Sequence, residues 1–329
     1  MSELDQVVAV LKAAPSVAVL THIHPEGDSI GSVLAASLAL REAGKVATAH
    51  VADRLTPGLA TLPGAEMLVR EAPGGRGYAC YLVLDTSGLD RTGGMLQGRP
   101  ADAVVVNVDH HPGNSRFGDV NWVEPEASSA GEMVYRILRE GGFPISRATA
   151  ANLYAAILTD SGSFHYGNST PQALRVAAAL VECGAAPEAV THGLYDHHDV
   201  GEWRLLSEAL ATLEVSPDGR LAWVEITLAA QARAGASLEV TEDFVQYPRS
   251  VGGVEMALAF KEVSATEVKV SFRSRGALDV AALAAQFGGG GHRNAAGCTL
   301  TGALPILRGQ ILAAAQAHLS GQTSHAARE

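Results

Sequence analysis

The stretch VVVNVDHH, residues 104–111, is an uninterrupted apolar run that ends in an acid and two imidazoles. A run this short and this apolar is typical of a strand buried on both faces of a parallel sheet. The carboxyl end of such a strand is where open α/β sheets place their chemistry. Taken alone, Asp109-His110-His111 is equally compatible with a turn at Pro112-Gly113 whose histidines are structural. Other strands that end in the same kind of residue favour the functional interpretation.

Two more apolar strands precede this one, and each leads into polar residues. Ser16–Leu20 (SVAVL) runs into the loop THIHPEGDS, residues 21–29, and Tyr78–Leu84 (YACYLVL) runs into Asp85. Val46 and its neighbours, residues 45–52, form a further candidate strand. Helical patterns are predicted at residues 2–14, 29–44, 128–141, 146–158, 171–183 and 187–195. Strands and helices that alternate in this way predict a parallel, doubly wound α/β sheet.

From about Leu210 the pattern changes to shorter, half-polar strands. Residues 254–263 and 267–274 are expected to form an antiparallel pair, followed by a helix over 279–287, a strand over 295–300 and a helix over about 305–319. The second half therefore predicts a smaller α+β domain. We expect one domain at residues 1–190 and a second at residues 208–320, joined by a linker at residues 191–207 and followed by a flexible tail at residues 321–329. The active-site cleft is expected to lie between the two domains.

The composition agrees with a globular protein of two domains. The chain has 329 residues, of which 47% are hydrophobic and 18% charged. No segment has the apolar length of a membrane span, and the start, MSELDQVVAV, lacks the basic segment of a secretory signal. We therefore expect a cytoplasmic protein without a membrane partner. Three widely spaced cysteines argue against a disulfide framework and a zinc ribbon.

The net charge of −11 is concentrated in the first part of the chain. Residues 1–206 carry fourteen Lys/Arg against twenty-three Asp/Glu, whereas the remainder is nearly balanced. A protein this acidic is poorly suited to gripping a long duplex, because non-specific affinity for nucleic acid comes from many phosphate contacts. Bound divalent cations would neutralise part of the acidic excess.

The polar residues at the predicted strand and helix ends form one candidate metal site. They are His22, Glu26, Asp28, Asp85, Asp109, His110, His111 and Asp160. Carboxylates and imidazoles without a thiolate suit manganese or magnesium better than structural zinc. There are enough ligands for two ions, whose usual task as a pair is in-line displacement at phosphorus. His24 and the second triplet, Asp196-His197-His198, are interpreted as outside the ligand set.

The second domain contains a candidate phosphate-binding segment. Gly288-Gly289-Gly290-Gly291 can present successive backbone N–H groups to an anion, and His292 and Arg293 add donors. A glycine run is also common as a plain flexible turn. Arg249, Arg273 and Arg275 would be solvated surface charges if taken singly, but beside a phosphate-cleaving site they become candidate clamps for substrate phosphates.

Six motifs, in order, resemble those of the DHH phosphoesterases that carry a DHH-associated C-terminal domain, a group that includes nanoRNase and pAp phosphatase enzymes. They are HIHPEGDSIGS (22–32), LDTS (84–87), VDHHPGN (108–114), TDSGSF (159–164), VKVSFRS (268–274) and FGGGGHRNAAG (287–297). The resemblance covers nearly the whole chain. It implies two manganese ions, with magnesium as the alternative.

The resemblance also implies a role for each site residue. His22, Glu26 and Asp85 would hold one ion, and Asp28, Asp85, His110 and Asp160 the other. Asp109 would orient its neighbours, and His111 would face the scissile phosphate. Where the family pattern has Asp, this chain has Glu26, which keeps the carboxylate on a longer stem.

The implied activity is cleavage of one kind of bond in two substrates. Very short 5′-phosphorylated RNA would be degraded to mononucleotides, and 3′-phosphoadenosine 5′-phosphate (pAp) would be converted to AMP. One alternative is a phosphodiesterase specific for pApA in cyclic-dinucleotide turnover, and another is a nucleotide-binding module without catalysis. The sequence leaves the choice between monomer and homodimer open.

Overall fold

A computed structural model describes residues 1–74, 76–196 and 199–326. The chain divides into two compact units, residues 1–197 and 198–329, which are described separately below. Each unit contains its own β-sheet with its own buried apolar clusters. Among the described helices, none has the length and apolar character needed to cross a membrane.

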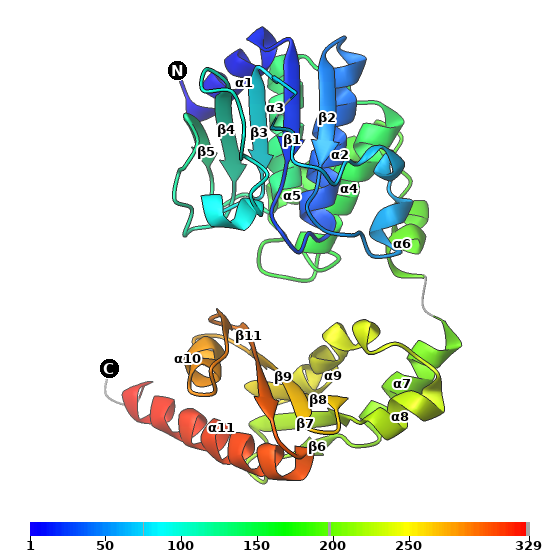
Figure 1. The fold of residues 1–329 in the computed structure, drawn as a ribbon, viewed down its shortest axis with the longest axis vertical. Coiled ribbons are helices and arrows are strands. Elements are labelled where there is room, and N and C mark those ends of the chain that lie inside the picture. Colours follow the sequence, from blue (N-terminus) through cyan, green and yellow to red (C-terminus); the bar gives the residue numbers. More distant parts are fainter. Residues whose placement is uncertain (75, 197–198, 327–329) are drawn as a thin grey trace. The chain divides into compact units, whose positions relative to one another are not determined.

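The first unit is built on a five-stranded sheet in which every pairing is parallel (Figure 1). The strand order is β2-β1-β3-β4-β5, with bounds β1 Ser16–Leu20, β2 Val46–His50, β3 Cys80–Leu84, β4 Val104–Asp109 and β5 Val120–Val123. The predicted parallel sheet is confirmed. From β1 the chain passes to β2 on one side and then returns to β3 on the other, so the order reverses between β1 and β3. In open α/β sheets this reversal marks the ligand-binding crevice.

Helices cover one face of this sheet (Figure 1). The helices that contact the strands are α1 Glu3–Ala13, α2 Gly27–Glu42 and α3 Ala130–Gly141. Behind them lie α4 Arg147–Asp160, which packs on α2 and α3, and then α5 Pro171–Glu182 and α6 Pro187–Tyr195, which pack on α4. Helix α2 is buried along most of its length, which is why its sequence lacks a polar stripe. Small residues let it lie close to α4, since a Cβ at Gly31 would be 2.5 Å from the Asn152 carbonyl oxygen.

Turns and one 3₁₀ helix, η3 Leu89–Thr92, take the place of α-helices on the other face. The 3₁₀ helices η1 Leu59–Thr61 and η2 Ala65–Met67, in the connection after β2, pack instead with the α-helices. Tyr81, Val83 and Val105 point to this face and pack with Met95 and Leu96 from the turns after η3. The sheet is therefore buried on both faces, as the continuous apolar strands predict, but α-helices supply only one of the covers.

Three differences from the predicted elements bear on the site. Helix α2 begins at Gly27, two residues before the predicted Ser29, because Glu26 caps it; Asp28 therefore lies in the first helical turn. Helix α4 continues to Asp160. Strand β5 was not predicted, because this short edge strand is only partly buried and gives a weak pattern.

The second unit contains a six-stranded mixed sheet in the order β10-β11-β9-β8-β7-β6. The strands are β6 Glu214–Val215, β7 Leu221–Ile226, β8 Met256–Ser264, β9 Glu267–Ser274, β10 Gly290–His292 and β11 Ala295–Thr301. The predicted antiparallel pair of β8 and β9 is confirmed, and β7 lies parallel to β8. One face packs with α10 Val280–Ala285 and α11 Leu304–Ala326. The other packs with α7 Val200–Leu210, α8 Leu228–Ala234, η4 Leu238–Val245 and α9 Gln246–Ser250.

Two predicted segments have more regular structure than expected. Residues 191–207, predicted as a linker, include the end of α6 and most of α7. Helix α11 continues to Ala326, so residues 321–326 of the predicted flexible tail are helical. A helix extends one hydrogen bond at a time until a breaker intervenes, and no proline follows Pro305 in the chain.

Candidate active site

The carboxyl edge of the first sheet brings the predicted ligands together. His22 follows β1, Asp85 follows β3, and β4 ends in Asp109, with His110 and His111 directly after it. Helix α2 contributes Glu26 and Asp28 from its amino end, and α4 contributes Asp160 as its last residue. Three sets of these side chains have ligand atoms within 4.8 Å of one another: His22/Glu26/Asp85, Asp28/His110/Asp160 and Asp85/His110/His111.

The first group is organised around a buried imidazole. His22 Nε2 lies 3.3 Å from Asp85 Oδ2 and 3.4 Å from Glu26 Oε2. The other ring nitrogen, Nδ1, is 2.7 Å from the carbonyl oxygen of Ile23, to which it donates. A backbone bond of this kind fixes the ring and leaves Nε2 to face the two carboxylates, as in metal-binding histidines generally.

Glu26 performs two tasks that its extra methylene allows. One carboxylate oxygen, Oε1, accepts from the backbone N–H of Ser29 at 3.2 Å and caps α2, and the other faces His22. The Ser29 hydroxyl accepts from the Glu26 N–H at 2.9 Å, which completes a capping box. The side chain is still 53% exposed, so its carboxylate is open to the site from the solvent side.

The second group is buried more deeply. Asp28 Oδ2 accepts from the backbone N–H of Ala130 at 2.7 Å, and Oδ1 accepts from that of Gly131 at 2.9 Å. These N–H groups form the amino terminus of α3, where partial positive charge favours a carboxylate. His110 Nε2 lies 3.6 Å from Asp28 Oδ2. Asp160 completes the group from the end of α4.

Asp85 lies between the two groups. Its Oδ2 faces His22, and its Oδ1 is 3.4 Å from His110 Nε2. Oδ1 is buried and has no hydrogen-bond partner among the described residues. The backbone of Asp85 has φ of +54°, a left-handed conformation that is uncommon outside glycine and clusters at functional sites. A buried carboxylate whose two oxygens face two ligand groups, one of them without a hydrogen-bond partner among the described residues, fits a residue that would hold divalent cations.

The charges of the cluster also fit divalent cations. Burial and the neighbouring carboxylates of Asp85 and Asp160 hold the pKa of Asp28 well above its usual range, and burial raises the pKa of Asp160 to about 6. Burial by itself would lower the pKa of His22 and His110, but the adjacent carboxylates outweigh it and raise both to about 10. Protons on two imidazoles thus offset the crowded acids, and divalent cations would take over that task.

His111 is set apart by its exposure and its partner. Its Nδ1 is 2.7 Å from Asp109 Oδ1, and the hydrogen bond to this fully buried carboxylate raises the pKa of His111. Asn114 donates to the other oxygen, Asp109 Oδ2, at 2.7 Å. With 43% of its side chain exposed, His111 is oriented by Asp109 and remains accessible to a ligand.

Three residues that support the site were missed by sequence reasoning. Asn114 holds Asp109, and Asn168 donates to Asp160 Oδ2 at 2.9 Å. Asp53 accepts the backbone N–H of His24 at 2.6 Å, where the chain turns with φ of +58° between His22 and Glu26. Asn114 falls inside the VDHHPGN motif, but Asp53 and Asn168 gave no comparable signal.

Two segments were predicted to lie outside the ligand set, His24 and the triplet Asp196-His197-His198, and the structure describes only part of the second. The His24 side chain is 83% exposed and is not among the three ligand groups. Asp196 accepts from His192 Nδ1 at 2.9 Å on the surface of α6. His197 and His198 lie outside the described residues.

The second unit places four of the predicted phosphate-binding residues on β10 and β9, the two strands that flank β11. Gly290, Gly291 and His292 form β10 at the edge of the sheet, where a loop was expected, because β11 pairs with them. Ala295 of β11 is opposite His292 on one side and Arg273 on the other. The side chain of His292 lies outside the described part of the structure.

The predicted arginines Arg249 and Arg293 already donate hydrogen bonds within this unit. Arg293 donates through Nε and Nη2 to the Ala277 carbonyl oxygen, at 3.0 and 2.6 Å. Arg249 is carried by α9, which packs against β9, and its Nη1 donates to Gln246 while its buried Nε has no partner among the described residues. Gly288, with φ of +72°, and Gly289 turn the chain from α10 into β10.

Comparison with known proteins identifies both halves of the chain. The model of the DHH family, N-terminal domain, matches residues 16–157, and that of the DHHA1 domain matches residues 225–320. The bifunctional oligoribonuclease and PAP phosphatase NrnA of Thermus thermophilus is 35% identical over 90% of this chain and 88% of its own length. The protein of the same name from Bacillus subtilis is 27% identical over 85% and 87%.

Solved structures agree on the fold. An exopolyphosphatase-related protein from Bacteroides fragilis has a TM-score of 0.88 at 23% identity, with 97% of this chain and 96% of that one covered. RecJ of Thermus thermophilus, solved in complex with Mn²⁺, has a TM-score of 0.51 at 12% identity. The match includes 97% of this chain and 55% of the RecJ chain. With its matches to both domain models and its identity to NrnA over most of both chains, this protein belongs to the DHH family, in the group whose DHH domain is followed by a DHHA1 domain.

Proposed function

We propose that this protein is a metal-dependent phosphoesterase that degrades very short 5′-phosphorylated oligoribonucleotides to mononucleotides and dephosphorylates pAp to AMP. The observation that carries the proposal is the pair of ligand groups on either side of Asp85, which contacts His22 of one and His110 of the other. Such a pair is suited to displacement at phosphorus. The activities printed in the name of the NrnA relative, oligoribonuclease and PAP phosphatase, are both reactions of that kind.

The ligand groups support two cations of the manganese or magnesium type. His22, Glu26 and Asp85 would hold one, and Asp28, Asp85, His110 and Asp160 the other. Imidazole and carboxylate donors without thiolate favour Mn²⁺, with Mg²⁺ as the alternative. When bound, paired cations neutralise the phosphate and activate water for attack at phosphorus.

His111 would stabilise the reacting phosphate. Asp109 accepts from its Nδ1, which fixes the ring and favours the imidazolium form. A charged donor held in place before the substrate arrives stabilises the negative charge that builds up on phosphoryl oxygens. Asp109 would act through His111, and Asn114 through Asp109.

The second unit would bind the 5′-phosphate of the same nucleotide. Arg249, with its unpartnered Nε, and Arg273 are candidate charged donors, and Arg293 and His292 are further candidates. Strand β10 is an edge strand, so alternate N–H groups of Gly290–His292 face away from β11 and can receive an anion, whereas those of Gly288 and Gly289 donate to the carbonyl oxygens of Ala285 and Ala284. A nucleotide anchored at its 5′-phosphate presents the phosphorus on its 3′ oxygen. In pAp that phosphorus is terminal, and in RNA it leads to the next nucleotide.

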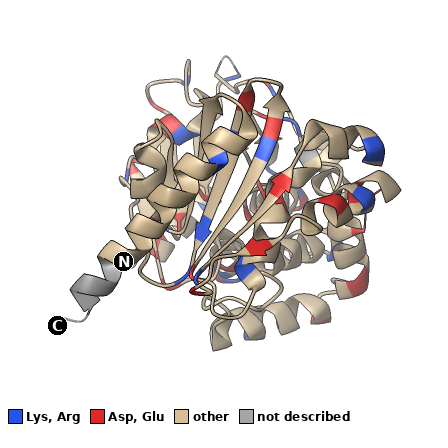
Figure 2. Ribbon diagram, turned by 90° about the horizontal axis from the view of Figure 1, so that it is seen from below, with Lys and Arg blue, Asp and Glu red and all other residues tan. Residues whose placement is uncertain are grey.

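The charge distribution favours short substrates. Figure 2 shows Lys and Arg positions interspersed with Asp and Glu positions along the described helices and strands. Since long duplexes bind through many phosphate contacts, we expect no duplex partner. We further expect the protein to act in the cytoplasm, where short RNA fragments are produced, as a monomer or a homodimer.

Product release tests the proposal directly. We expect the protein with Mn²⁺ to release AMP from pAp and mononucleotides from a 5′-phosphorylated RNA dinucleotide, and Asp85→Asn to abolish both. Asp102→Asn, which changes an exposed aspartate before β4, is the matched control and should behave as wild type. Nucleotide binding without turnover would support a silent binding module instead. Turnover of pApA, but of neither pAp nor dinucleotides of other sequence, would support the pApA-specific alternative.

A further inference from the structure

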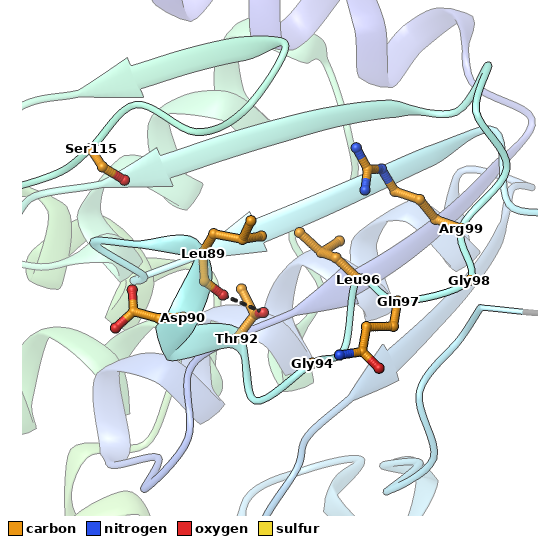
Figure 3. A pocket seen from close by; sticks show the side chains of 9 residues that line it. All are labelled: Leu89, Asp90, Thr92, Gly94, Leu96, Gln97, Gly98, Arg99 and Ser115. Atoms are coloured by element: carbon orange, nitrogen blue, oxygen red, sulfur yellow. Dashed lines mark hydrogen bonds between the residues drawn. The ribbon is translucent and has the colours of Figure 1, made fainter.

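A pocket of about 860 Å³ opens beside the candidate metal centre, on the sheet face opposite the α-helices. It is lined by the segment that joins β3 to β4 and by one residue after β4: Leu89, Asp90, Thr92, Gly94, Leu96, Gln97, Gly98, Arg99 and Ser115 (Figure 3). Its volume is within the range of about 300–1,000 Å³ that small-molecule sites occupy. All of these residues belong to the first unit, and none is among the metal-site residues described above.

Backbone hydrogen bonds attach the pocket to the ligand-bearing loops. The N–H of Ser115 donates to the carbonyl oxygen of Ser87 at 2.8 Å, and Ser87 is two residues after Asp85. The N–H of Ile23, directly after His22, donates to the carbonyl oxygen of Arg91 in η3 at 2.8 Å. The near end of the pocket is therefore continuous with the edge of the sheet that carries His22, Asp85 and His111.

The lining changes in character along the pocket. Asp90 and Ser115 stand at the end near the metal centre, Leu89 and Leu96 lie in the middle, and Arg99 stands at the far end (Figure 3). Leu89 is 54% exposed and is one of the residues that line the pocket. The Thr92 hydroxyl donates to the Leu89 carbonyl oxygen at 2.7 Å and holds the turn that presents it. No carboxylate among the described residues pairs with Arg99.

We propose that this pocket binds the second nucleotide of an oligoribonucleotide, the one on the 3′ side of the scissile phosphate. The inference rests on the function proposed above. The nucleoside would lie over Leu89 and Leu96, because an apolar surface favours a flat base over water. The Asp90 carboxylate would repel a phosphate there but can accept from ribose hydroxyls, and Arg99 would bind the phosphate that follows.

This assignment predicts that RNA substrates use the pocket and that pAp does not. pAp ends at the phosphate that is attacked, so it has no nucleoside to place in the pocket. A 5′-phosphorylated dinucleotide places one nucleoside there, and a trinucleotide adds the phosphate that would reach Arg99. The dinucleotide and the trinucleotide therefore test different parts of the pocket, and pAp is the substrate that does not use it.

The first test is Leu89→Ala, assayed with pAp, dinucleotide and trinucleotide. Loss of the apolar contact should raise KM about fivefold for the dinucleotide and trinucleotide, with kcat/KM for pAp unchanged. Val46→Ala removes a comparably exposed side chain at the opposite edge of the sheet and should change none of the three. An equal change for pAp and the dinucleotide, or no change for either, would overturn the proposal.

The second test is Arg99→Ala. It should raise KM for the trinucleotide about fivefold and leave the dinucleotide and pAp unaffected, because only the trinucleotide carries the additional phosphate. Arg139→Ala, at the exposed last turn of α3, is the matched control. An Arg99→Ala variant that cleaves the trinucleotide with wild-type KM would show that Arg99 does not bind substrate.

Failure of the pocket and failure of the proposed function give different results. If the wild-type protein with Mn²⁺ turns over neither pAp nor the dinucleotide, the proposed function is wrong. If it turns over both and the Leu89 variant does not discriminate between them, only the pocket assignment is wrong.

Discussion

At the scale of single residues, several candidate ligands are held by partners outside the three ligand groups. Asp28 is fixed by the amino end of α3, Asp160 by Asn168, and His22 by the backbone after it. Such partners restrict ring and carboxylate orientation before any cation binds, which reduces the cost of assembling the site. Glu26 differs because one of its own oxygens caps the helix that positions it.

The two tasks of Glu26 can be separated by substitution. Glu26→Gln keeps an oxygen for the Ser29 N–H but removes the charge, so we expect Mn²⁺ affinity to fall at least about tenfold with little loss of stability. Glu26→Ala removes the cap as well and should also cost about 0.5–2 kcal/mol of unfolding free energy. Calorimetric Mn²⁺ titration and urea denaturation measure the two effects. Wild-type affinity in Glu26→Gln would show that the carboxylate is a cap only.

Metal binding should depend on pH through the histidines. Because the pKa values of His22 and His110 are raised to about 10, both rings hold protons near neutral pH when no metal competes. A cation must displace those protons, so we expect Mn²⁺ affinity to rise between about pH 6 and 9, with protons released on binding. Calorimetry in buffers of different ionisation enthalpy measures the release. Affinity and heat that are independent of pH and buffer would contradict the assignment.

At the scale of elements, the site depends on how closely α2 and α4 approach. Helix α2 carries Glu26 and Asp28, and α4 carries Asp160, so the distance between the helices sets the distance between ligands. Gly31 allows that approach, because a Cβ there would be 2.5 Å from Asn152 O and 3.1 Å from the Ala156 Cβ.

We expect Gly31→Ala to push the helices apart, at a cost of about 1–3 kcal/mol. Urea denaturation followed by circular dichroism measures the loss, and Mn²⁺ affinity should fall in the same variant. Gly309→Ala in α11, where nothing lies within 4 Å of an added Cβ, should be neutral or slightly stabilising. Equal behaviour of the two variants would contradict the close-packing account.

The elements also show which parts of the fold a sequence can predict. Strands β1, β3 and β4 were predictable because continuous apolar runs leave few other structures, and their carboxyl ends then placed His22, Asp85 and His110 together. Helix α7 was missed because Val200 and Trp203 are exposed and blur its apolar face. Strand β10 was missed because its glycines have little strand propensity and only the pairing with β11 orders them.

The contacts that orient the ligands were harder to predict than the ligands. Asn168 and Asp53 reach Asp160 and His24 across distances along the chain that no local pattern encodes. The 3₁₀ helix η3 and the pocket it lines depend in the same way on side chains that meet only in the folded unit.

At the scale of the whole molecule, the two units have separate cores, and the predicted metal ligands all belong to the first. We therefore expect Mn²⁺ to raise the unfolding temperature of the first unit and leave that of the second nearly unchanged, since ligands stabilise what they bind. Differential scanning calorimetry with and without Mn²⁺ measures this, and Asp85→Asn should abolish the shift. An equal rise of both transitions would contradict independent units.

The central claim is that one site cleaves both pAp and short RNA. The most direct test is competition, in which hydrolysis of a 5′-phosphorylated RNA dinucleotide in Mn²⁺ is followed at increasing pAp concentrations. A shared site predicts purely competitive inhibition, with an inhibition constant for pAp equal to its own KM as a substrate when that KM reports binding. Inhibition that lowers kcat, or dinucleotide cleavage that saturating pAp leaves unchanged, would show that the two reactions do not share this site.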